Sequence, residues 1–162
     1  MQAARGRQSH FNVATAVDGA LFTVMGIVIT IFTLWTAYMG YLFFKQKTFA
    51  QGLSTGYIWG IRTGFVFFVI FAFEGGQMAS SLAHTIGAPD GGSGLPLLNW
   101  STRFGDLRVA HFFGMHALQL LPLAGYYFVK TKPALLIAAF IWFILVLLLY
   151  VQALRGIPLL PV

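Results

Sequence analysis

The sequence contains no cysteine and few charged residues. Without cysteine, the chain forms no disulfide, offers no thiolate to a metal and has no cysteine nucleophile. Charged residues make up 9% of the chain and hydrophobic residues 58%, whereas soluble domains carry about 25% charge. Because water does not wet so uncharged a surface, the composition predicts an integral membrane protein.

Acidic residues are the scarcest charged class, with four against ten lysines and arginines and a formal net charge of +6. In a soluble protein such an excess can indicate nucleic-acid binding. Here the basic residues lie between apolar runs, where they suit anionic lipid headgroups. We therefore expect the lipid bilayer as a partner, with further membrane subunits or helices as a second class, and no nucleic acid.

Four apolar segments are each long enough to cross a membrane, which takes about 20 helical residues. They cover approximately residues 16–44, 56–84, 106–129 and 133–154. Because the runs are continuous rather than alternating, they predict helices and not a β-barrel. The expected fold is all-α: an integral membrane four-helix bundle in which residues 1–162 form a single transmembrane domain.

Four crossings place both chain ends and the long polar loop, about residues 87–105, at one membrane surface, which we call face A. The short connections at residues 45–55 and 130–132 lie at the opposite surface, face B. Lysine pairs in these short connections favour face B as cytoplasmic. In a bacterial inner membrane, face A is then expected to be periplasmic.

Two local patterns predict how the helices pack and bend. Gly56, Gly60 and Gly64 recur every four residues, which lets helix backbones approach closely in lipid, here within the chain rather than in a dimer. Pro122 falls inside the third segment and predicts a kink there.

All four acids and all four histidines fall on the face A side of this topology. Glu74 and His116 each lie about 15 Å inside the membrane from that face, so we expect their side chains at one level. An ionisable group in a membrane span is costly and is a functional hypothesis by default. Glu74 is therefore the candidate catalytic or proton-moving group, and Asp106 is expected to cap the third helix.

The histidines predict a metal or haem site at face A, suited to electron transfer, because imidazoles bind zinc, copper and iron. The candidate ligands are His84, His111 and His116, with Asp106 as a further metal ligand. His111 and His116 are five residues apart, unlike the i,i+4 pairs that bind metal on one helix. A haem instead takes one histidine from each of two helices. The bound group stays open, as does whether the chain is an enzyme.

A zinc-dependent lipid hydrolase is one alternative. The residues SSLAH, from Ser80 to His84, followed by Asp106 and then His111 and His116, resemble the pattern of ceramidase-like and adiponectin-receptor-like membrane hydrolases. The resemblance implies a zinc-activated water that cleaves a lipid amide or ester. Those proteins have more helices and a closer HxxxH pair.

A second resemblance covers more of the chain. RGRQSHFN from Arg5 to Asn12, HTIGAPDGG from His84, and GLPLLNWSTRFGDLRVAHFFGMHALQLLPL from Gly94 resemble segments of uncharacterised bacterial polytopic membrane proteins. Members are longer, with extra helices ahead of the first motif, so the chain resembles their C-terminal part. The resemblance marks the long loop and the third segment as the family signature and implies no activity.

A third alternative needs no cofactor. A half-buried glutamate and histidine set also suits a proton path, a part of a transporter or a structural subunit of a larger complex. A transporter of the inverted-repeat type would have matching broken helices in its two halves. One proline interruption, at Pro122, does not make such a repeat.

Overall fold

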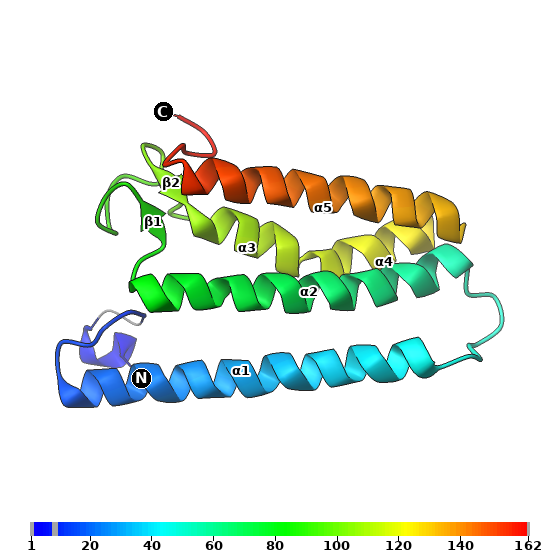
Figure 1. The fold of residues 1–162 in the computed structure, drawn as a ribbon, viewed down its shortest axis with the longest axis horizontal. Coiled ribbons are helices and arrows are strands. Elements are labelled where there is room, and N and C mark those ends of the chain that lie inside the picture. The colour runs from blue at the N-terminus through cyan, green and yellow to red at the C-terminus, as the bar shows by residue number, and fades with distance from the viewer. Residues whose placement is uncertain (1, 8–9, 162) are drawn as a thin grey trace.

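The computed structural model describes residues 2–7 and 10–161. Most of these residues form helices that run side by side (Figure 1). The elements are a 3-10 helix (Ala3–Arg5), α1 (Ala16–Lys45), α2 (Thr55–Ser81), β1 (Thr85–Ile86), β2 (Gly105–Asp106), α3 (Leu107–Met115), α4 (Ala117–Tyr127) and α5 (Lys132–Leu154). Three helices, α1, α2 and α5, are long and apolar enough to cross a membrane. The predicted helical fold with membrane-length helices is confirmed, with one small antiparallel sheet added.

The third predicted segment is two helices, and its break lies at His116 rather than at Pro122 (Figure 1). Pro122 lies inside α4. The carbonyl of Phe112 still accepts from the backbone amide of His116 at 3.0 Å as well as from its imidazole. The carbonyl of Phe113 accepts from the indole of Trp142 on α5 at 3.2 Å. Side chains that take up main-chain carbonyls interrupt a helix. The segment is therefore interrupted at His116, the kink at Pro122 stays a prediction, and four membrane-length helices are not confirmed.

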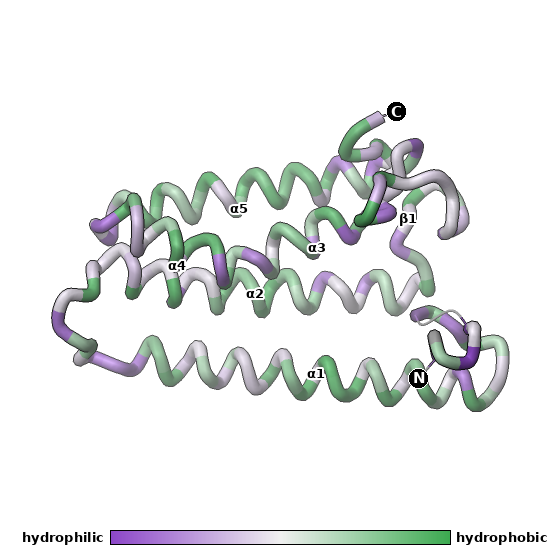
Figure 2. Tube along the Cα trace, turned by 180° about the vertical axis from the view of Figure 1, so that it is seen from behind, coloured by the Kyte–Doolittle hydropathy of each residue, from purple (hydrophilic) through white to green (hydrophobic). Residues whose placement is uncertain are grey.

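The predicted arrangement of the two faces agrees with the structure. The first and last described residues and the β1–β2 sheet lie at one end of the bundle, which corresponds to face A (Figure 1). The connections at residues 46–54 and 128–131 lie at the other end, face B. Hydrophobic residues dominate along α1 and α5, and hydrophilic residues gather toward the ends (Figure 2).

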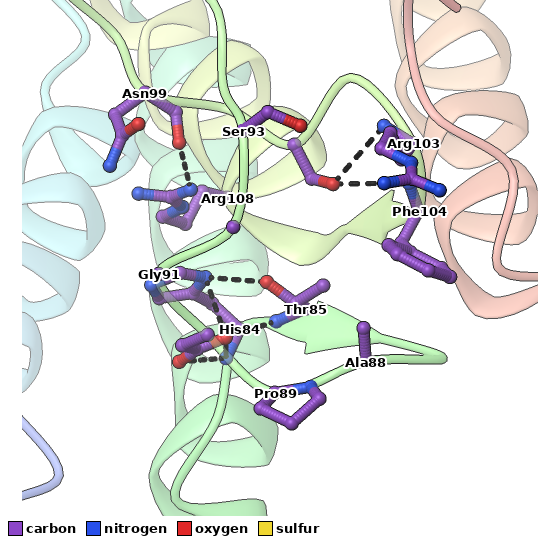
Figure 3. Close-up of a pocket in the computed structure, with 13 residues that line it drawn as sticks. His84, Thr85, Ala88, Pro89, Gly91, Ser93, Asn99, Arg103, Phe104 and Arg108 are labelled. Atoms are coloured by element: carbon purple, nitrogen blue, oxygen red, sulfur yellow. Dashed lines mark hydrogen bonds and ion pairs between the residues drawn. The ribbon is translucent and has the colours of Figure 1, made fainter.

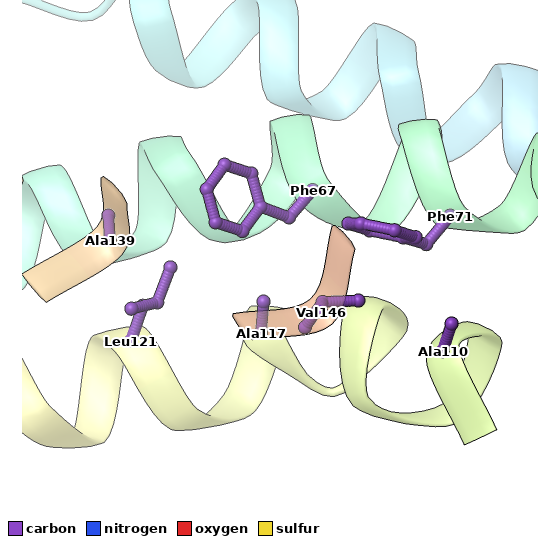
Figure 4. Close-up of a cluster of buried hydrophobic side chains, with 7 residues drawn as sticks. All are labelled: Phe67, Phe71, Ala110, Ala117, Leu121, Ala139 and Val146. Atoms are coloured by element: carbon purple, nitrogen blue, oxygen red, sulfur yellow. The ribbon is translucent and has the colours of Figure 1, made fainter. Parts of the chain in front are cut away.

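Helix α2 lies at the centre and packs along α3 and α4. A β-carbon on Gly56 would lie 1.8 Å from the carbonyl oxygen of Val129, and one on Gly60 would lie 2.5 Å from that of Leu121. These distances confirm the glycine ladder as a packing surface within the chain. The core on this side is shown in Figure 4 and consists of Phe67, Phe71, Ala110, Ala117, Leu121, Ala139 and Val146.

Helix α1 lies on the outside of the bundle and contacts mainly α2 (Figure 1). Its buried residues are few and mostly polar or small: Asp18, Thr33, Thr36 and Gly40. The threonine hydroxyls donate to carbonyls four residues earlier in the same helix, so they bring no unpaired hydroxyl donor into the interface. Most of the apolar surface of α1 is exposed, as expected of a helix that faces lipid.

The small sheet joins the end of α2 to the start of α3. Helix α2 stops at Ser81, three residues before the predicted end, because Leu82 adopts a left-handed backbone with φ 52°. Thr85 then pairs with Asp106 in the sheet, and the amide of Leu107 donates to the carbonyl of His84 at 3.0 Å. The two ends of the long loop are thereby held together at face A.

Candidate functional site

Glu74 and His111 form a pair between α2 and α3. The Nδ1 atom of His111 lies 3.2 Å from Oε2 of Glu74 and donates to the carbonyl of Phe71 at 2.7 Å. The Glu74 side chain is only 9% exposed, and neither of its oxygens accepts a hydrogen bond within the described residues. Burial of a carboxyl group without a hydrogen bond is costly, and the imidazole of His111 is the polar group that lies beside it.

A glycine makes room for the imidazole in this pair. A β-carbon on Gly75 would lie 2.9 Å from Cε1 of His111, whereas one on Gly76 would meet nothing within 4 Å. One turn further toward face A, the hydroxyl of Tyr150 on α5 donates to the side-chain oxygen of Gln77. Polar contacts thus continue from Glu74 along α2 toward face A.

His116 is not part of this pair, although it was expected at the same level as Glu74. Its Nδ1 bonds to the carbonyl of Phe112 in its own chain segment, and its ring stacks on the Phe112 ring with centroids 4.0 Å apart. Helix rise predicts depth in the membrane but not which way a side chain points. The partner of Glu74 is therefore His111.

His84 and Asp90 form a second polar group in the long loop. The carboxylate of Asp90 accepts from the backbone amide of Thr85 at 2.9 Å and from that of His84 at 3.2 Å, and it lies 3.1 Å from Nδ1 of His84. Asp90 therefore holds the beginning of β1 and orients the imidazole.

Asp106 and Arg108 form the third group. The carboxylate of Asp106 accepts from the Nε of Arg108 at 2.9 Å and from its Nη2 at 2.6 Å. It also accepts from the backbone amides of Arg108 and Ser101. Asp106 is the N-cap of α3, which confirms that prediction, and its side chain is fully buried.

His84 and Asp90 of the second group and Arg108 of the third line a pocket of about 410 Å³ at face A. Figure 3 shows His84, Arg103, Phe104 and Arg108 around it. Of its cationic groups, Arg108 is paired with a carboxylate and His84 lies beside Asp90. Arg103 contacts the Phe104 ring at 6.0 Å. The pocket is therefore polar but close to electrically balanced, which does not select strongly for an anion.

The predicted ligands His84, His111 and His116 belong to three different local networks. Within residues 2–7 and 10–161, no three histidine, aspartate or glutamate side chains gather closely enough to hold a metal ion. Nothing in the geometry therefore supports a three-ligand site, and the metal or haem site stays a prediction.

Sequence reasoning missed two parts of the site. The carbonyl of Phe71 holds the His111 ring, and no sequence pattern marks a backbone acceptor on another helix. Asp90 accepts from two backbone amides, and the sequence around it contains a pattern that could have indicated this role. Aspartates in Gly- and Pro-rich segments commonly accept from nearby backbone amides.

Acid is expected to loosen the beginning of β1. Burial and the positive charge of Arg108 lower the pKa of His84 below its ordinary value, although Asp90 and Asp106 oppose them. Burial raises the pKa of Asp90, but hydrogen bonds from Thr85 and His84 outweigh it and lower that pKa. The unfolded loop therefore binds protons more readily than the folded loop. Its stability falls as pH drops below about 6.5 and falls again below about 4.

Hydrogen exchange at the Thr85 amide, corrected for the intrinsic rate at each pH, measures this effect. Protection should decrease stepwise toward acid. His84→Gln should remove the upper step and Asp90→Asn the lower one. Protection that stays constant or rises as pH falls would contradict the assignment.

Comparison of the chain with profiles of protein families, with curated proteins and with solved structures finds no match. The resemblance to a family of bacterial polytopic membrane proteins therefore stays a prediction. Within its first motif, RGRQSHFN, Gln8 and Ser9 lie outside the described residues.

Proposed function

We propose that the chain is an integral membrane protein that takes up and releases a proton at the Glu74–His111 pair. One observation carries this proposal: a buried carboxyl in a membrane-length helix, with no hydrogen-bond donor among the described residues, lies 3.2 Å from an imidazole nitrogen. A lone buried charge is strongly disfavoured. The pair therefore holds one exchangeable proton, either on the carboxyl of Glu74 or on Nε2 of His111, because Nδ1 keeps its own proton in the bond to the carbonyl of Phe71.

In this proposal the chain crosses the membrane four times. Helices α3 and α4 together form one bent crossing, because Leu107–Tyr127 is about 30 Å long, which equals the thickness of the hydrocarbon layer. Glu74 then lies inside the bilayer, and face A is expected at the periplasmic side of a bacterial inner membrane. Intramembrane pairs of this kind occur in proton relays.

The proton is expected to arrive from face A. On that side of the pair lie Gln77, Tyr150 and the loop pocket. On the face B side lies the apolar core around Phe67 and Leu121. The chain then supplies the face A half of a proton path across the membrane. A further membrane subunit or a conformational change completes the path, which fits a chain that is one part of a transporter.

Glu74→Gln tests this proposal because it keeps the shape of the side chain and removes its proton exchange. Infrared difference spectra between acid and neutral pH should contain a carboxylic acid band in the parent protein that is lost in Glu74→Gln. Proton uptake into vesicles that carry the protein should fall about a hundredfold, the scale of a lost proton-transfer group. An unchanged band in Glu74→Gln would exclude Glu74 as the exchanging group.

Two adjacent glycines provide a matched control. Gly75→Ala adds a methyl group against the His111 ring, whereas Gly76→Ala adds the same group where nothing lies within 4 Å. Both changes raise helix propensity equally. Only Gly75→Ala should shift the pH at which the Glu74 band titrates. Equal shifts would mean that the band does not report on the pair.

A metal or haem centre for electron transfer is the second candidate. Nδ1 of His111 and of His116 each donates to a main-chain carbonyl, which leaves Nε2 free, as in many metal-bound histidines. A haem takes only one or two ligands from a chain. A zinc hydrolase takes three, and the described residues hold no such group. An absorption spectrum with elemental analysis distinguishes this candidate from the proton site. A Soret band, or stoichiometric metal, that is present in the parent protein and lost in His111→Ala or His116→Ala would favour the metal or haem centre.

A further inference from the structure

A second pocket lies at face B, far from the groups described above. Its volume is about 640 Å³. It lies between the end of α1, the connection to α2 and the first turns of α2, and its lining includes Lys45, Lys47, Phe49, Trp59 and Arg62. Cations and aromatic rings thus line one hollow at the place where the apolar helices end.

The charge in this pocket is not compensated. Lys45, Lys47 and Arg62 line it, and Lys132 lies over the ring of Trp59 at 4.0 Å. All four acids of the sequence are at positions 18, 74, 90 and 106, toward face A. Within the described residues, none of these four cations forms an ion pair with a carboxylate. An anion entering the pocket therefore meets only positive charge.

Arg62 is held in place before any ligand arrives. Its Nη2 donates to the carbonyl of Gln46 at 2.9 Å, which satisfies a backbone acceptor just beyond the end of α1. Its guanidinium lies 5.1 Å from the Trp59 ring centroid and 5.6 Å from that of Phe44. Its Nε is buried and has no acceptor in the part of the chain that the structure describes, so the fixed guanidinium retains an unused hydrogen-bond donor.

We infer that this pocket binds the phosphate of an anionic phospholipid headgroup. Guanidinium and ammonium groups are the usual protein partners of phosphate, and basic pockets between membrane helices bind anionic headgroups. Phe44 lines the pocket and the ammonium of Lys45 lies over the ring of Tyr41. The exposed side chains of Tyr41 and Phe44 on α1 offer an apolar surface along which the acyl chains lie. The inference does not depend on the Glu74–His111 pair.

Quenching of Trp59 by brominated lipid tests the inference. The protein is placed in phosphatidylcholine vesicles that contain either brominated phosphatidylglycerol or brominated phosphatidylcholine. We expect stronger quenching by the anionic lipid, and Trp59→Phe should remove this excess. The double variant Lys45→Gln with Lys47→Gln changes two exposed side chains, so it spares the core. It should weaken the preference for the anionic lipid about 25-fold, roughly fivefold for each lysine.

Arg103→Gln is the matched control, because it removes an exposed cation at face A. It should leave the excess quenching unchanged. Equal quenching by the two lipids, or an equal loss in Arg103→Gln and in the lysine variant, would overturn the inference. If inorganic phosphate at millimolar concentration abolished the excess, the site would take free phosphate and the lipid assignment would be wrong.

Discussion

Gly56→Ala is expected to lower the free energy of unfolding by about 3 kcal/mol, at the upper end of the usual cost of overpacking. The new methyl group would lie 1.8 Å from the carbonyl oxygen of Val129 and 2.8 Å from the carbonyl carbon of Lys130. These are backbone atoms, so no side chain can rotate away. The amide of Gly56 also donates to the carbonyl of Lys130 at 2.8 Å, and separation of α2 from α4 would break this bond. Unfolding in mixed micelles of mild detergent and dodecyl sulfate measures the change.

Gly26→Ala is the matched control for this prediction. A β-carbon on Gly26, in the middle of α1, meets nothing within 4 Å. Alanine there should leave the stability unchanged or raise it by up to about 1 kcal/mol through helix propensity. Similar losses at both positions would show that the close approach of α2 and α4 does not determine the effect.

Asp106→Ala is the second change with a large expected effect, a loss of about 3 kcal/mol. The carboxylate accepts from the guanidinium and the amide of Arg108 and from the amide of Ser101. Alanine leaves the two backbone amides and Nε of Arg108 without this acceptor and removes the N-cap of α3, whereas Nη2 of Arg108 keeps the carbonyl of Asn99. Because β2 includes Asp106, exchange of the amides in β1 should also become faster.

A double-mutant cycle with Arg108 separates the ion pair from the cap. Asp106→Ala with Arg108→Ala should be less damaging than the sum of the two single changes, because the guanidinium no longer lacks a partner. Asp106→Asn keeps an oxygen for the amide of Arg108 and should cost less than alanine. If Asp106→Ala, Asp106→Asn and the double variant all lost the same stability, the guanidinium of Arg108 would contribute nothing to the fold.

The length and continuity of the apolar runs were sufficient to predict α1, α2 and α5 and the two ends of the bundle. The glycine ladder also predicted which surface of α2 packs closely. The break at His116 could not be predicted in this way, because it depends on Trp142 of α5 reaching the carbonyl of Phe113. The early end of α2 depends on the left-handed backbone of Leu82, which is rare for leucine.

The candidate site was predicted in part. The sequence identified Glu74 as the exceptional residue, because a carboxyl in a membrane span has few explanations. It did not identify His111 as the partner, since depth along a helix axis does not specify direction around it. Asp106 was predicted as a cap because its position before an apolar run is local information.

The distribution of charged groups makes the two ends of the bundle chemically unlike. The three aspartates, the glutamate and the four histidines all lie from the face A end to the middle of the bundle. Face B carries lysines and Arg62 and no carboxylate or imidazole side chain. In the proposed membrane topology, the groups that can exchange protons therefore meet only the solution at face A, and a difference in acidity across the membrane acts on the molecule from that side.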